Sequence, residues 1–246
     1  MSGSCYGVLS WLWRWRLTAV VALVLVAVVI AGVTLALTSG TRPSGRVAEV
    51  ASDGRATATL RIASGTPDLS VTVADLGSTL VRASVPAGAP VRPVFIQNGA
   101  LQLTLATASG DASRYPVTVT LSSAVTWTLD FDGGTQHTTA NLRGGKVADV
   151  TFGAGSDVID LAMPAPDGTS VIQVASGASQ FLLRLPPGVP ARVTAGAGAA
   201  LLTVDSVNRT GVAGGTVVTP PDWSTARDRF DVDATSGVDT MSVGRW

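Results

Sequence analysis

Glycines recur at nearly constant spacing in the second half of the chain, and this repeat restricts the possible folds more than any other feature. Gly134, Gly155, Gly177 and Gly198 are separated by 21, 22 and 21 residues. A fixed period near 20 residues, with one strand per repeat in constant register, indicates a solenoid. The aligned residues, four, six and eight positions after each glycine, are Thr138, Ala140 and Leu142; Ile159, Leu161 and Met163; Phe181, Leu183 and Leu185; Leu202, Val204 and Ser206; and, after Gly237, Met241 and Val243, with Arg245 outside the pattern.

Short segments with period-2 alternation, separated by Gly, Pro, Asp and Ser, predict an all-β domain. They are 58–63, 69–75, 101–107, 116–121, 125–131, 157–163, 170–175, 181–186, 191–195 and 201–205. Stacking the repeats at about 4.8 Å would align the apolar positions inside. The glycine before each strand fits a corner with positive φ or a crowded backbone. The predicted fold is therefore a β-solenoid with about 21–22 residues per rung, and a β-sandwich with evenly spaced hairpins is the alternative.

The repeat is clearest over 125–246 and less regular before Gly134. Gly65 and Gly99 precede similar strands, but at irregular spacing. We expect the N-terminal rungs to be distorted or to form a small separate sheet.

An uncharged apolar run of 22 residues extends from Leu17 to Thr38. As a helix it is long enough to cross a hydrocarbon core of about 30 Å. Tryptophan and arginine alternate just before it, in WLWRWR at 11–16, as expected at a headgroup interface. The apolar region of a cleavable signal peptide is usually shorter, about 7–15 residues. The run therefore predicts an uncleaved transmembrane anchor.

These features divide the chain into a cytoplasmic tail (1–16), a transmembrane helix (17–38), a linker (39–47) and an extracytoplasmic β domain (48–246). Arginines on the two sides of the helix are nearly balanced, so the positive-inside rule does not decide the orientation. A short tail before a single signal-anchor most often stays inside. We therefore predict a single-pass protein of the cell membrane with its N-terminus in the cytoplasm.

Composition excludes several functions. The 17 Lys and Arg residues balance the 17 Asp and Glu residues, and no basic cluster suggests nucleic-acid binding. The single cysteine, Cys5, excludes an intramolecular disulfide and a cysteine-based zinc site. The single histidine, His137, excludes a two-histidine metal motif. We expect no cofactor.

The repeats carry a resemblance to a known family. It is seen in four runs: LDFDGG (129–134), ANLRGGKVADVTFGAGSDVIDLAMP (140–164), GASQFLLRLPPGVPARVTAGAGAALLTVD (177–205) and ARDRFDVDATSGVDTMSVGRW (226–246). They resemble the adhesin-like "toast-rack" β-solenoids of bacterial, often actinobacterial, membrane-anchored envelope proteins. The resemblance implies a fold and an envelope role, by analogy with envelope-stress sensing and surface adhesion. It implies no catalytic residues.

Two carboxylates are the main candidates for chemistry. Asp130 and Asp132 are two residues apart on one predicted strand and so point to the same face. Paired carboxylates serve as acid and base in glycoside hydrolysis. No other acid or base is evident nearby, and the DFDGG sequence is typical of a strand that runs into a turn. We therefore predict no enzymatic activity, with a carbohydrate-active enzyme as the alternative.

Two further motifs are interpreted as structural. The segment Gly153–Ile159 matches the core of a calcium-binding β-roll repeat, but that site needs aspartates in consecutive turns, and the following repeats have Ser179 and Ala200 there. It is predicted to be a turn without a metal. His137 falls at an outward position, without the sequence partners of a catalytic triad.

An insertion of about 17 residues separates the last two repeats, since Gly198 and Gly237 are 39 residues apart. It contains Trp223 after two prolines, followed by the charged run Arg227–Arg229. Trp223 is a lid over the last rung or a possible contact for a partner. Because repeat arrays need atypical capping segments, we predict the lid.

Together these inferences predict a non-enzymatic, membrane-anchored protein of the cell envelope with an interaction, structural or sensing role. Its expected partners are the membrane and an envelope protein or cell-wall component, and its oligomeric state is left open. A regulatory subunit whose output is the transmembrane segment is a third possibility.

Overall fold

The structure is a computed structural model that describes residues 46–107 and 111–246. The chain divides into two units, Met1–Arg42 and Pro43–Trp246, and all described residues belong to the second. The predicted tail and transmembrane helix lie outside the described residues. Within 46–107 and 111–246, no helix is long and apolar enough to cross a membrane.

The described residues form β-strands and a single 3₁₀ turn, η1 (Ala112–Arg114), which confirms the all-β prediction. The strands are β1 (Val47–Ala51), β2 (Thr57–Ile62), β3 (Thr66–Ala74), β4 (Thr79–Ser84), β5 (Val91–Asn98), β6 (Ala100–Thr107), β7 (Val117–Ser122), β8 (Thr126–Phe131), β9 (Thr135–Asn141), β10 (Lys146–Phe152), β11 (Ser156–Ala162), β12 (Thr169–Val174), β13 (Ala178–Leu185), β14 (Ala191–Ala195), β15 (Ala199–Val204), β16 (Val207–Val212), β17 (Thr216–Val218), β18 (Arg229–Ala234) and β19 (Val238–Arg245).

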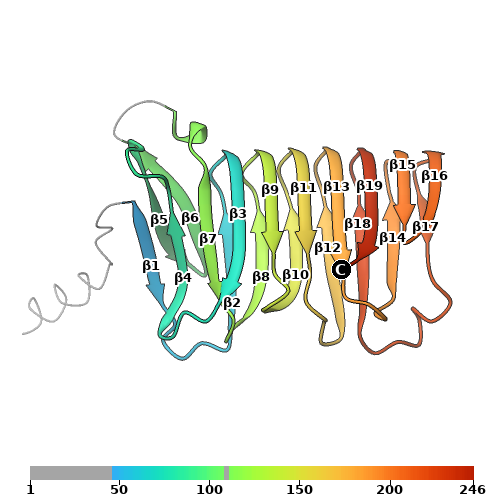
Figure 1. The fold of residues 1–246 in the computed structure, drawn as a ribbon, viewed down its shortest axis with the longest axis horizontal. Coiled ribbons are helices and arrows are strands. Elements are labelled where there is room, and N and C mark those ends of the chain that lie inside the picture. The colour runs from blue at the N-terminus through green and yellow to red at the C-terminus, as the bar shows by residue number, and fades with distance from the viewer. Residues whose placement is uncertain (1–45, 108–110) are drawn as a thin grey trace, which may run out of the picture. The chain divides into compact units, whose positions relative to one another are not determined.

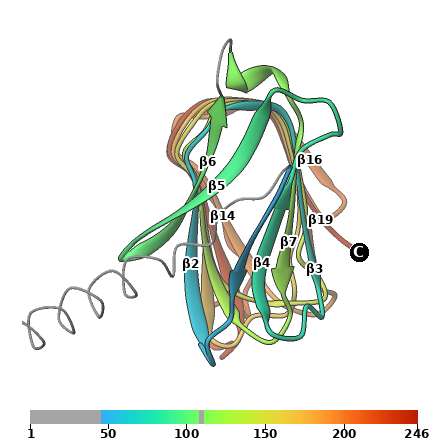
Figure 2. The ribbon, with the colours of Figure 1, turned by 90° about the vertical axis from the view of Figure 1, so that its left-hand side faces the viewer.

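The strands form two sheets that face each other (Figures 1 and 2). Sheet A has the order β1-β4-β7-β3-β9-β11-β13-β19-β15-β16, and sheet B has the order β17-β14-β18-β12-β10-β8-β2-β6-β5. Through the middle of both sheets, neighbouring strands are parallel. Strands adjacent in sequence, such as β8 and β9, lie in opposite sheets, whereas the hairpins of a sandwich would pair them within one sheet.

A strand of sheet B followed by a strand of sheet A forms one rung of the stack, and the predicted register of the sheet A strands is confirmed. Ile159 pairs with Thr138 on one side and with Phe181 on the other. Phe181 pairs in turn with Met241, and Met241 with Leu202. All five side chains are buried between the sheets. The offsets from each glycine therefore identify the inward face.

The order of the rungs differs from the order of the repeats. Rung β18–β19, the last in the chain, lies between β12–β13 and β14–β15 in both sheets (Figure 1). At the other end, β2–β3 likewise lies between β6–β7 and β8–β9. The Gly237 repeat is therefore an internal rung of the stack, although it is the last repeat in the sequence. Rungs of similar length and apolar pattern stack on one another equally well, so spacing does not encode their order.

The repeat glycines line up in the turns between the sheets. Backbone amides of Thr135, Ser156 and Ala178 donate to the carbonyl oxygens of Gly155, Gly177 and Gly237, respectively. Of the repeat glycines, Gly198 has a positive φ, 90°, which favours glycine. A Cβ on Gly155 would lie 3.6 Å from the Gly177 carbonyl oxygen, an ordinary contact. The expectation that the repeat glycines have a positive φ or a crowded backbone is thus confirmed at Gly198 and wrong at Gly155.

Aromatic rings fill the interior between the sheets. Phe131 and Phe152 stack with ring centroids 4.6 Å apart, and Phe152 meets Phe181 edge-on at 6.2 Å. Trp127 is fully buried, and its Nε1 donates to the Ser122 carbonyl oxygen at 2.9 Å. These contacts connect neighbouring rungs and the two sheets, so each rung depends on the next for its core.

Antiparallel strands cover both ends of the stack. At one end β16 pairs with β15 and β17 with β14. At the other end β4 pairs with β7, β1 with β4, and β5 with β6. Parallel stacking therefore stops at strands that cannot continue the repeat, a common way to prevent association through sheet edges.

Candidate functional site

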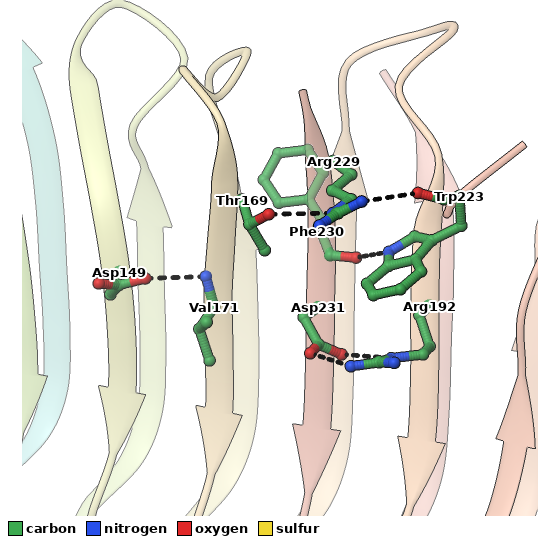
Figure 3. Close-up of polar contacts among 8 residues, drawn as sticks. All are labelled: Asp149, Thr169, Val171, Arg192, Trp223, Arg229, Phe230 and Asp231. Carbon is green, nitrogen blue, oxygen red and sulfur yellow. Dashed lines mark hydrogen bonds and ion pairs between the residues drawn. The ribbon is translucent and has the colours of Figure 1, made fainter. Parts of the chain in front are cut away.

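Trp223 lies in the segment that returns the chain from β17 to β18, against the outer face of sheet B (Figure 3). Its Nε1 donates to the carbonyl oxygen of Phe230 at 2.7 Å. The guanidinium carbons of Arg192 and Arg229 lie 3.9 Å and 4.6 Å from the ring centroid. The half-buried indole is therefore held by one hydrogen bond and two cation–π contacts.

Both arginines are fixed by further polar contacts. Arg192 on β14 binds Asp231 on β18 through two of its nitrogens (Figure 3). The hydrogen bond that Arg192 donates to Asp231 raises the pKa of Arg192, which keeps the guanidinium charged beside the ring. Arg229 donates to Thr169 Oγ1 at 3.0 Å and to the carbonyl oxygen of Trp223 at 3.3 Å. The cluster thus fastens the returning segment to β12, β14 and β18.

This geometry corrects the predicted lid. Trp223 does not cover the last apolar ladder, because β16 and β17 occupy the end of the stack. Trp223 lies instead over β18, the sheet B strand of the rung that is inserted between β12–β13 and β14–β15. The insertion is divided into two end strands, β16 in sheet A and β17 in sheet B, and a segment that returns the chain to β18. Its length alone could not distinguish these two parts.

Asp130 and Asp132 lie at the end of β8, on the outer side of sheet B. Asp132 forms an ion pair with Arg61 of the neighbouring strand, with 2.5 Å between Oδ2 and Nε. Partial burial raises the pKa of Asp130, and repulsion from Asp132 adds to this, opposed by Arg61. The charge of Asp132 is therefore neutralised by Arg61, and Asp130 keeps its proton to a higher pH than a free aspartic acid. Glycoside hydrolysis needs two carboxyl groups on opposite sides of the scissile bond.

His137 has a partner that the sequence did not indicate. Parallel pairing of β3 and β9 places Asp68 beside it, with 3.3 Å between His137 Nδ1 and Asp68 Oδ1. Both side chains are exposed. On the other side of His137 the paired residue is Val158, which supplies no nucleophile. The two residues can orient each other, but this row lacks the third member of a triad.

The remaining motifs lie in turns and exposed strands. Gly153 and Gly155 form the turn between β10 and β11, followed by the exposed Asp157. No group of three or more potential metal ligands occurs among residues 46–107 and 111–246. Asn208 is exposed on β16, and Cys5 lies outside the described part of the chain.

The outer face of sheet A carries rows of small polar side chains. In one row Ser70 pairs with Thr118 and Thr139, Thr139 with Asp160, and Thr203 with Ser242. We call the following residues the polar face: Ser70, Thr72, Thr118, Thr120, Thr139, Asn141, Asp160, Thr203 and Ser242. Leu182 interrupts the first row between Asp160 and Ser242. The polar face thus spans parallel strands from β7 to β15.

The comparisons with known proteins give a likeness of fold. No protein-family model matches the chain, and no curated protein is significantly similar to it. A crystal structure of a candidate cell adhesion protein from Clostridium sporogenes has a TM-score of 0.58 and 14% identity, covering 83% of this chain and 100% of that one. A candidate adhesin from Bacteroides fragilis has a TM-score of 0.29 and 12% identity, with 82% and 98% covered.

The fold is therefore similar to that of the Clostridium protein. At 14% identity this likeness concerns the fold alone. The chain is thus an all-β protein with an adhesin-like fold.

Proposed function

We propose that the chain is a membrane-anchored protein of the cell envelope whose β-solenoid presents a binding surface outside the membrane. Its role is non-enzymatic: adhesion, or contact with another envelope component. The apolar run 17–38 serves as the anchor, with the N-terminus in the cytoplasm. The name of the Clostridium protein refers to cell adhesion, which agrees with this role.

The observation that carries the proposal is the polar face. Its Ser and Thr side chains repeat at the spacing of strands, about 4.8 Å, over a broad part of sheet A. Such a surface suits many shallow contacts with an extended partner. Catalysis uses a few groups that converge in a concave site, and the Asp130–Asp132 pair has its second carboxylate occupied by Arg61.

The Trp223 cluster is a second contact point, on the opposite sheet. Tryptophan and arginine are enriched where proteins contribute most binding energy. The exposed part of the indole and the two guanidinium groups form a rigid, charged aromatic surface. A rigid surface loses little conformational entropy when a partner binds.

Site-specific crosslinking in cells tests the proposal. A photoreactive amino acid replaces Thr139, at the centre of the polar face, in the full-length chain. We expect discrete adducts with an envelope component, and their absence when the same group replaces the buried Leu161. No adducts from Thr139, Thr72 and Thr203 would contradict a binding role for this face. Turnover of an oligosaccharide that is abolished by Asp130→Asn would favour the enzyme instead.

A further inference from the structure

The β5–β6 hairpin stands away from the two sheets (Figure 2). A groove opens between this hairpin and the outer side of sheet B. Its volume is about 680 Å³. Outward residues of β2 and β8 form the floor, and the hairpin tip from Gln97 to Leu101 forms one wall. Arg55 and Ala148 complete the lining. The groove is thus a hollow between a flat sheet and an overhanging hairpin.

One side of the groove is an unpaired strand edge. β2 pairs with β8 over its whole length, from Thr57 to Ile62. It pairs with β6 only from Leu60 to Ile62, because β6 starts at Ala100 and turns away with the hairpin. The first half of β2 therefore has no partner strand on the β6 side. Because the Thr126 N–H group donates to the Ala56 carbonyl oxygen, the backbone groups of Ala58 also face β8, and those of Thr57 and Thr59 face the open side, where both threonines line the groove.

The floor carries hydroxyl groups without protein partners. Thr57 pairs in register with Thr126, and Thr59 with Thr128, which gives a two-by-two array. Within residues 46–107 and 111–246, none of these four hydroxyls forms a hydrogen bond, whereas the hydroxyl of Thr66 donates to the carbonyl oxygen of Tyr115 at 2.6 Å. The groove thus offers both backbone and side-chain hydrogen-bonding groups to a ligand.

We propose that this groove binds an extended polypeptide segment of a partner protein, which pairs with the free edge of β2 as a short added strand. Open strand edges bind peptides in this way, because the backbone groups of both chains become satisfied. Thr57 and Thr59 lie beside the added strand, whose outward side chains extend over β2 to Thr126 and Thr128 on β8, and Gln97 contacts its polar groups. No aromatic side chain lines the groove, so it lacks the flat apolar surface on which a sugar ring packs.

The proposal rests on the binding role proposed above and assigns one class of partner to a further surface, separate from the polar face and the Trp223 cluster. Strand pairing with β2 requires free N–H groups at alternate residues of the peptide. A peptide that pairs as a strand directs every second N–H group toward β2. Methylation of those nitrogens removes hydrogen bonds, whereas methylation of the alternate ones does not.

The test uses the full-length protein in lipid nanodiscs and peptides selected from a random decapeptide library. Affinity is measured by fluorescence anisotropy. We expect Thr128→Arg, which fills the floor, to raise Kd at least tenfold, and the matched control Thr210→Arg, at an exposed position of β16, to leave it unchanged. N-methylation should raise Kd at least tenfold at one set of alternate residues and have little effect at the other set.

Three results would overturn the proposal. They are selected peptides that bind equally well to Thr128→Arg, N-methylation effects without alternation, and chitin oligosaccharides that displace the peptide and fail to bind Thr128→Arg. If no peptide is selected but Thr139 still forms adducts in cells, the groove is wrong and the proposed function stands. If both fail, both are wrong.

Discussion

Phe181 lies in register with Met241, and Leu202, although closer in sequence, lies on the far side of Met241. The same order holds in sheet B, where β18 separates β12 from β14. The last rung of the chain therefore connects two rungs that precede it. Its removal would break the stack internally rather than shorten it.

Deletion of residues 229–246 should therefore destabilise more than the deleted rung. Because β12, β13, β14 and β15 each lose a parallel neighbour, we expect loss of protection from hydrogen exchange across 169–204. Residues 57–162, on the other side, should retain most of their protection. Hydrogen-exchange mass spectrometry of the full-length protein and the truncated chain makes the comparison. Uniform protection of 191–204 in the truncated chain would show that β14–β15 can stack directly on β12–β13.

The inward register can be tested at two adjacent positions. Leu183 is 1% exposed, whereas Arg184 points outward and forms an ion pair with Asp160. Leu183→Ala should lower the free energy of unfolding by about 2–5 kcal/mol, because it leaves a cavity in the core. Arg184→Ala should cost at most about 1 kcal/mol, as exposed ion pairs do. Denaturant titration measures both, and similar losses would contradict the assigned register.

Trp223 contributes to stability through its contacts with Phe230, Arg192 and Arg229. Trp223→Ala removes one hydrogen bond and two cation–π contacts and should lower the free energy of unfolding by about 1–3 kcal/mol. Trp223→Phe keeps an aromatic ring and should lose less. Because β16 and β17 still cover the end of the stack, both variants should elute at the wild-type oligomeric state. Self-association of Trp223→Ala on size-exclusion chromatography would instead support a capping role.

The raised pKa of Asp130 predicts a pH-dependent effect of its neutral analogue. A carboxyl group whose pKa is raised by folding destabilises the native state once the pH exceeds the unfolded value of 3.8. This destabilisation grows as the pH rises from 3.8 to the pKa of the folded state, and it is absent below 3.8. Asp130→Asn should therefore stabilise at pH 7, by less than about 1 kcal/mol for this partly exposed group, and have little effect at pH 3. Destabilisation at pH 7 would mean that the attraction of Arg61 dominates.

The membrane topology can be tested with the single cysteine. If Cys5 precedes a membrane anchor with its N-terminus inside, an impermeant maleimide should label it only after the cells are permeabilised. Asn208→Cys in a Cys5→Ser background is the matched control, because Asn208 is exposed on the β domain. It should be labelled in intact cells. The reverse pattern would place the β domain in the cytoplasm.

The period-2 alternation of apolar residues and their constant distance from the repeat glycines were sufficient to predict the all-β class and the inward residues. Burial depends directly on which side chains alternate, so Ile159 and Phe181 could be assigned before any pairing was known. The order of the rungs could not be predicted, because Met241 fits beside Phe181 or beyond Leu202 with the same spacing. Long-range pairs such as Asp68 and His137 depend on that order. The groove depends on where β6 leaves β2, which no residue pattern indicates.

The inserted position of β18–β19 also determines when the fold can be completed during synthesis. Residues 191–204 leave the ribosome before the rung that attaches them to the rest of the stack. Until residues 229–246 have followed, the edges of β12, β13, β14 and β15 that will receive that rung remain open. The nascent chain therefore exposes unpaired edges of parallel strands until residues 229–246 have been synthesised and have emerged from the ribosome.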